Sequence, residues 1–132
     1  MFLHKLSSQE KVNFLKLAHH ISKSDNNFSK KQKNIISIYC FEMEINDINY
    51  DEDKFILNDT LIKFKTNKTK KIVLLEIMAL VYSDSIIHEE EQKIIDTMLD
   101  IFGFSQILAN IFLEWTKTIL AVSEQGKLLI EL

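Results

Sequence analysis

Residues 72–82 read Ile72-Val73-Leu74-Leu75-Glu76-Ile77-Met78-Ala79-Leu80-Val81-Tyr82, an apolar run without glycine or proline. Leucine, methionine and alanine are frequent in it, and these residues favour a helix buried on most sides over a strand. The acidic turn Ser83-Asp84-Ser85 follows, and a second amphipathic run opens at Glu89. The apolar run is too short, and too interrupted by Glu76, to span a bilayer. The stretch therefore predicts two consecutive helices joined at an acidic corner.

The composition extends this helical prediction to the whole chain. Its 132 residues include no proline and only two glycines, so the usual turn signals of a β fold are missing. The hydrophobic fraction of 46% and the charged fraction of 27% are typical of a globular domain with its own core. We predict an all-α fold, a single domain over residues 1–132 with six to seven helices.

Charge and targeting signals narrow the classes of partner. The net charge is −3, and every cationic side chain other than histidine is lysine. Nucleic-acid binding needs an electropositive face and favours arginine, so we expect no nucleic-acid partner. The single Cys40 lies among apolar residues and reads as a small buried hydrophobe. No secretory segment precedes the first helix signal, so we expect a cytoplasmic protein without membrane insertion.

Capping signals place the other helices. Two capping boxes predict helices over residues 7–21 and 29–44, and they pair Ser7 with Glu10 and Ser29 with Gln32. We expect a short helix from Asp59 to Phe64 with Asn58 as its cap, and a helix from Glu89 that ends before Gly103. The last helix should span about 105–125, with Gly126 as its breaker and 127–132 as an apolar tail.

The two halves of the chain align with each other. Placing Asp84 over Asp25, an offset of 59 positions, also brings Leu74 over Leu15. Each half, about 8–45 and 68–103, then reads as helix, Ser-Asp turn, helix. We predict two related helical hairpins that pack face to face with pseudo-two-fold symmetry.

The repeated pattern resembles the TerB-like family, which is named after a tellurite-resistance protein. The family also includes the N-terminal domain of DnaJ-like membrane-anchored co-chaperones. The matching residues are Leu75-Glu76-Ile77-Met78-Ala79-Leu80-Val81-Tyr82-Ser83-Asp84 with Glu91, and Leu17-Ala18 with Ser24-Asp25 in the first half. The family has a glycine after each aspartate, where this chain has Asn26 and Ser85, and a first-half glutamate where this chain has Gln32.

The resemblance implies a non-enzymatic helical bundle. It suggests acidic residues that bind a divalent metal, or an adaptor role in a stress or phage-defence response. On this basis the candidate metal ligands are Asp25, Glu76, Asp84 and Glu91, with Ca²⁺, Mg²⁺ or Mn²⁺ as the expected ion. Because Gln32 replaces the family's glutamate in the first half, we expect metal binding by acidic residues in the second half more than in the first.

Each candidate ligand also has a purely structural interpretation. Asp84 and Glu91 can be helix-capping residues. Glu76 stands alone on an apolar helix and should then reach a rim and pair with a lysine or histidine. His19, His20 and His88 have no spacing that predicts a metal site. A metal-dependent hydrolase would need the carboxylates to converge on an open cleft.

A second functional hypothesis treats the chain as a structural interaction module. The last helix carries Ile111, Trp115 and Ile119, and we expect self-association as a homodimer or a protein partner at this helix.

Overall fold

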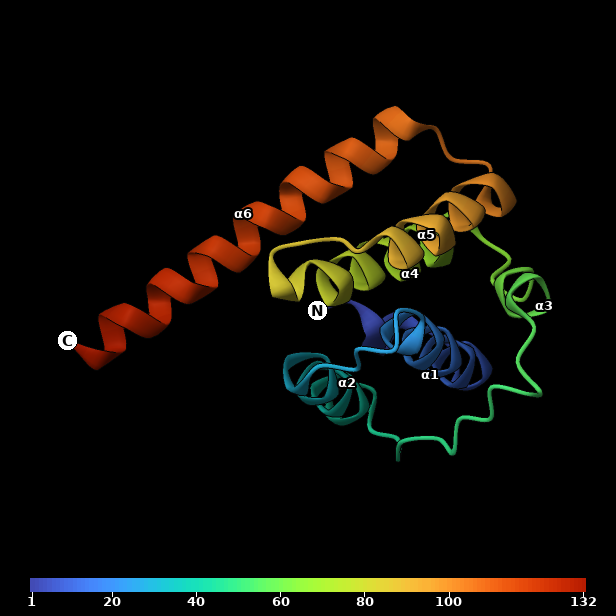
Figure 1. Ribbon diagram of the computed structural model, residues 1–132, viewed down its shortest axis with the longest axis horizontal. Helices are drawn as coiled ribbons and strands as arrows, with labels where there is room; N and C mark the ends of the chain where they lie inside the picture. The colour runs from blue at the N-terminus through green and yellow to red at the C-terminus, as the bar shows by residue number, and fades with distance from the viewer.

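The computed structural model describes all 132 residues as six α-helices and two 3-10 turns, without strands (Figure 1). The elements in chain order are η1 (Leu3–Lys5), α1 (Ser8–Lys23), α2 (Lys30–Met43), α3 (Leu57–Leu61), α4 (Asn67–Val81), η2 (Tyr82–Asp84), α5 (Glu89–Phe102) and α6 (Gln106–Glu131). The predicted all-α class is confirmed, with the helix count at six.

The central position of α4 follows from its sequence. It packs against α1, α2, α5 and α6, and its apolar residues join one continuous core with those of α1 and α5. Leu15 of α1 and Leu74 of α4 are both fully buried in that core. Figure 1 shows α6 crossing this assembly and continuing past the end of α4. No helix combines the length and the apolar character needed to cross a membrane.

The predicted helix starts at the two capping boxes are confirmed. Ser7 Oγ accepts from Glu10 N at 3.2 Å, and Ser29 Oγ accepts from Gln32 N at 3.1 Å, each answered by the reciprocal side-chain bond. Gly103 ends α5 with a φ of 75°, a conformation that glycine adopts without the steric cost of a side chain.

Both predicted ends of the short helix are wrong. The helix predicted from Asp59 to Phe64 runs from Leu57 to Leu61. It begins after Ile56, which offers no side-chain cap, so Asn58 lies inside the helix and not at its start. Burial of Leu61 and Phe64 in the core decides the position of this segment more strongly than a capping signal does.

Gly126 does not end the last helix, because α6 continues to Glu131. A glycine inside a helix costs only about 1 kcal/mol relative to alanine, and no proline follows to stop the helix. An ion pair between Lys127 Nζ and Glu124 Oε1 at 3.2 Å also spans the glycine. The expected tail 127–132 is therefore mostly helix.

The two Ser-Asp corners have matching local geometry. Ser24 Oγ donates to Ile21 O at 2.7 Å, and Ser83 Oγ donates to Leu80 O at 2.7 Å. Asn26 and Ser85, at equivalent places in the alignment of the halves, both have left-handed backbone, with φ of 60° and 66°.

The irregular connection between α2 and α3 is held against α1 by two histidines. His19 Nε2 lies 2.8 Å from Asp47 Oδ1, and His20 Nδ1 lies 3.0 Å from Tyr50 OH. The His20 ring also stacks on Phe55 with a centroid separation of 4.3 Å. Burial lowers the pKa of His20, so the neutral ring is favoured at this contact.

Candidate metal centre

Three potential ligands meet where the first corner faces the start of α5. One atom each from Asp25, His88 and Glu91 lies within 4.8 Å of the other two. Asp25 follows α1, whereas His88 is the N-cap of α5 and Glu91 lies in its first turn. The group therefore joins the two halves of the chain.

Glu91 is the buried member of this group, with no exposed surface. Its Oε1 accepts from His88 N at 3.0 Å, and its Oε2 accepts from Gln32 Nε2 at 3.0 Å. Burial raises the pKa of Glu91, and the nearby Asp25 charge acts in the same direction, although the two hydrogen bonds oppose them. A carboxylate in this environment gains more from a nearby positive charge than one in water does.

Asp25 and His88 complete the group at a less buried edge. Asp25 Oδ1 accepts from Asn27 N at 3.0 Å, while Oδ2 lies 3.7 Å from His88 Nε2. The Asp25 side chain is 16% exposed and the His88 side chain 39%. An ion could therefore approach from solvent on the His88 side without displacing the core.

Of the four ligands proposed from the sequence, the structure brings Asp25 and Glu91 together and leaves Glu76 and Asp84 out. Glu76 is buried under η1, where its Oε1 accepts from the Met1 amino group at 2.8 Å and from Phe2 N at 2.9 Å. Its expected lysine or histidine partner is wrong, since residues at the start of the chain provide its hydrogen bonds and its positive charge. Asp84 is half-buried at the end of η2, outside the group.

His88 is the member that the sequence interpretation missed. No other histidine or cysteine lies at the spacing of a metal-ligand pair from His88. A usable signal was its position three residues before Glu91, because the N-cap and N3 side chains of a helix lie close together in the first turn. The aspartate then had to come from the other half of the chain.

A hollow beside the group is lined by other residues. This hollow, of about 430 Å³, is lined mainly by polar residues of α1, α5 and the α2–α3 connection, among them His20, Lys23, Glu52 and Lys93. None of Asp25, His88 and Glu91 lines it. The carboxylates therefore do not converge on this surface as a hydrolase site would require.

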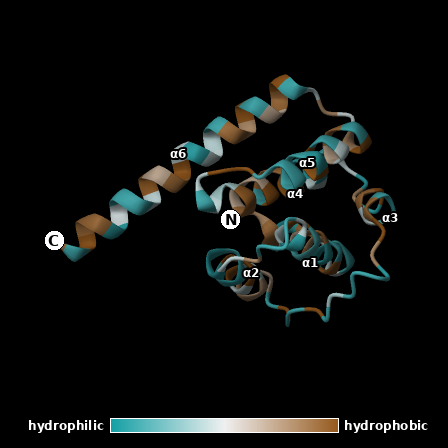
Figure 2. Ribbon diagram, in the orientation of Figure 1, coloured by the Kyte–Doolittle hydropathy of each residue, from teal (hydrophilic) through white to brown (hydrophobic).

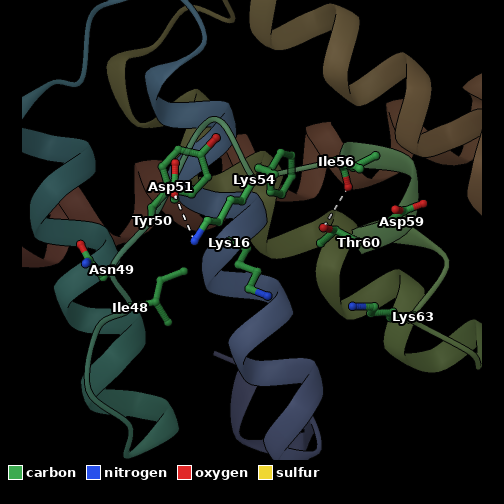
Figure 3. A pocket seen from close by; sticks show the side chains of 11 residues that line it. Lys16, Ile48, Asn49, Tyr50, Asp51, Lys54, Ile56, Asp59, Thr60 and Lys63 are labelled. Carbon is green, nitrogen blue, oxygen red and sulfur yellow. Dashed lines mark hydrogen bonds and ion pairs between the residues drawn. The ribbon is translucent and has the colours of Figure 1, made fainter.

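A second hollow of about 320 Å³ lies between α1, the α2–α3 connection and α3 (Figure 3). Lys16, Lys54 and Lys63 line it together with Asp51 and Asp59. Lys54 Nζ lies 3.9 Å from Asp51 Oδ2, so part of the positive charge is balanced within the hollow. Its wall has charges of both signs and no convergent set of ligands.

Comparisons of the chain with models of known protein families, with curated proteins and with solved structures found no match. A functional proposal therefore rests on the site itself. Two carboxylates and an imidazole from two distant segments meet there, and one of the carboxylates, that of Glu91, is buried.

Proposed function

We propose that the chain is a non-catalytic helical binding domain of the TerB-like type, and that Asp25, His88 and Glu91 hold one divalent cation. The observation that carries this proposal is the convergence of three ligand atoms within 4.8 Å from two distant segments. Asp25 belongs to the first half of the chain, and His88 and Glu91 lie 63 and 66 positions after it. Two helix ends that only needed caps would not require this convergence.

The ligand set indicates which ion to expect. Carboxylates suit Mg²⁺, Ca²⁺ and Mn²⁺, whereas an imidazole suits Zn²⁺ and other transition metals. One histidine with two carboxylates therefore favours Mn²⁺ or Zn²⁺ over the Ca²⁺ or Mg²⁺ expected from aspartate and glutamate alone. Gln32, which donates to Glu91 Oε2, would orient the glutamate from behind.

The backbone of the two corners supports the TerB-like part of the proposal. The family has glycine after each aspartate, and glycine favours positive φ. Asn26 and Ser85 occupy these places and have φ of 60° and 66°. The substitutions therefore keep the backbone conformation in which the family pattern uses glycine, at both corners.

The biological role within this proposal is that of an adaptor in a stress or defence response. A cation that ties the first corner to α5 would hold the two hairpins in one relative position and so set the shape that a protein partner meets. The position of the group between two distant segments supports such a structural use, and none of its three ligands lines the adjoining hollow.

Titration calorimetry with Mn²⁺, Zn²⁺, Mg²⁺ and Ca²⁺ tests the proposal on the wild type, Asp25→Asn and Asp84→Asn. The two variants are a matched pair, because each removes one charge from an equivalent corner. We expect one site for Mn²⁺ or Zn²⁺ in the wild type and in Asp84→Asn, and at least a tenfold weaker site in Asp25→Asn.

Two outcomes would overturn the metal site. Absence of binding heat and of any change in Tm with all four ions would exclude it. Equal losses in Asp25→Asn and Asp84→Asn would show that general acidity, and not the convergent group, attracts the ion.

A further inference from the structure

The second half of α6 lacks tertiary support. Every residue from Ala121 to Leu132 is exposed apart from Gly126, which is half-buried, and the helix projects beyond the bundle (Figure 1). Hydrophobic residues recur along this half, as the hydropathy colouring of the ribbon shows (Figure 2). A helix of this length with an internal glycine is marginal without packing. The projecting half of α6 therefore calls for a packing partner.

A groove runs between this projecting half, η2 and α2. Its volume is about 720 Å³, and its apolar lining comes from Ile35, Ile38, Tyr82, Leu120 and Ala121. Three lysines stand along it, Lys31, Lys117 and Lys127, with Glu124 as its acidic residue. Ile38 is 62% exposed, and Phe41, one helical turn further on α2, is 87% exposed. The groove therefore has the apolar lining and charged rim that an amphipathic helix requires.

The charged residues of α6 are arranged so that the helix is complementary to an antiparallel copy of itself. Lys117 lies as far before the Leu120–Ala121 bond as Glu124 lies after it. Glu114 and Lys127 are related in the same way. When two copies of α6 run antiparallel about this bond, Lys117 therefore faces Glu124 of the other copy, and Lys127 lies level with its Glu114. A parallel pairing would place like charges together.

We propose that the groove receives α6 of a second copy of this chain, in an antiparallel two-fold dimer centred on Leu120 and Ala121. Leu120 and Ala121 of both copies meet around the two-fold axis, where the small Ala121 lets the helices approach closely. The projecting half of each α6 then lies along α2 of its partner, where its apolar residues cover Ile38 and Phe41. One surface patch thus pairs with itself, as a two-fold interface requires.

This interface differs from the one expected from the sequence. Ile111, Trp115 and Ile119 lie nearer the supported half of α6, and Trp115 already packs against Phe2 with a centroid separation of 6.4 Å. Ile119 is half-buried against the bundle. The groove face of α6 adds a charge pattern that selects a second copy over an unrelated helix.

Charge reversal tests the pairing through a mixing experiment. Light scattering should give twice the 15.5 kDa chain mass for the wild type. Lys117→Glu places two glutamates opposite each other, and Glu124→Lys does the same with two lysines, so each variant alone should shift to the monomer. An equimolar mixture of the two should form a heterodimer, because every facing pair is then of opposite charge.

The mixing experiment distinguishes contacts between two chains from contacts of Lys117 within its own chain. Lys117 Nζ also lies 3.4 Å from Glu114 Oε1 and 5.6 Å from the Tyr82 ring centroid. Loss of those contacts would persist after mixing, whereas an intermolecular contact is restored. Circular dichroism should show equal helix content in both variants.

Cysteine cross-linking locates the face. Under oxidation, Ala121→Cys should form a disulfide-linked dimer, because the two copies of residue 121 meet near the two-fold axis. Val122→Cys, on the opposite side of α6, is the matched control and should stay unlinked.

A monomeric wild type at all accessible concentrations would overturn the proposal, as would a mixture that stays monomeric. Cross-linking through Val122→Cys alone would place a dimer on the outer face of α6 and exclude the groove. Recovery of a different protein on α6 together with a monomeric wild type would show that the groove serves another partner.

Discussion

The two acidic corners have the same backbone but different surroundings. Each has a serine that donates to the carbonyl three residues earlier and a left-handed residue after the aspartate. Only the first corner, with Asp25, faces two further potential ligands, His88 and Glu91. The local sequence therefore gives both corners the same backbone conformation. The helix that packs against each corner determines which side chains face its aspartate.

The alignment of the two halves identifies which residues at the second corner correspond to Asp25, His88 and Glu91. They are Asp84, Ser29 and Gln32, which occupy the positions of Asp25, His88 and Glu91. The second corner packs on α2, and Lys31 Nζ reaches Ser83 O at 3.5 Å. Serine and glutamine are poor metal ligands beside histidine and glutamate. The second corner therefore lacks the histidine and the glutamate that make the first corner a candidate metal site.

Gln32→Glu should change the free energy of unfolding the most. It places a glutamate in the first half at the position that aligns with Glu91 in the second half. Gln32 is buried, and its Nε2 lies 3.0 Å from Glu91 Oε2, so the variant brings two carboxylates together away from water. We expect the free energy of unfolding at pH 7 to fall by about 3 kcal/mol. Denaturant unfolding measures it, with the exposed Lys30→Glu on the same turn as a control expected to change stability by less than about 0.5 kcal/mol.

The loss in Gln32→Glu should shrink at acidic pH, where one carboxyl holds a proton, and on addition of a bound cation. An equal loss in Lys30→Glu, or a loss independent of pH, would contradict a buried contact between positions 32 and 91.

Glu91→Gln should have a smaller effect that depends on pH. Because the pKa of Glu91 is raised in the folded state, the folded protein binds more protons than the unfolded chain just above pH 4.5. Wild-type stability from this group therefore falls as pH rises from about 4.5 through the raised pKa. The variant lacks this fall.

We expect Glu91→Gln to cost about 1 kcal/mol at pH 4, where a neutral carboxyl is replaced and Gln32 loses its acceptor. The cost should decrease towards pH 7. Unfolding curves across this range measure the trend in the absence of metal, and a cost that grows with pH would show that the ionised carboxylate is favoured in the fold.

Ser85→Gly should give the smallest change, a stabilisation of about 0.5–1 kcal/mol. Serine at φ 66° carries a steric cost that glycine avoids. Asn26→Gly at the other corner is the matched variant, and its gain should be only a few tenths, because asparagine tolerates this conformation better. Thermal unfolding compares them, and an equal or larger gain at Asn26 would contradict the left-handed backbone at Ser85.

Much of the architecture was predictable because it rests on short-range signals. The apolar run of α4, the capping boxes at Ser7 and Ser29, and Gly103 each act within a few residues, and they placed the main helices correctly. The errors at Asn58 and Gly126 arose where such a signal was weak and packing or continued helix propensity prevailed.

By itself the sequence determined the helices, the paired corners and the acidic character of the first turn of α5, because hydrogen bonds and side-chain periodicity within each segment specify them. Only the tertiary structure decided which carboxylates meet. It gave Asp25 and Glu91 a common site with His88, enclosed Glu76 beneath η1 and left Asp84 apart. The physical reason is that a ligand set depends on distances between segments, and these distances are set by how the buried faces of α1, α4 and α5 pack together.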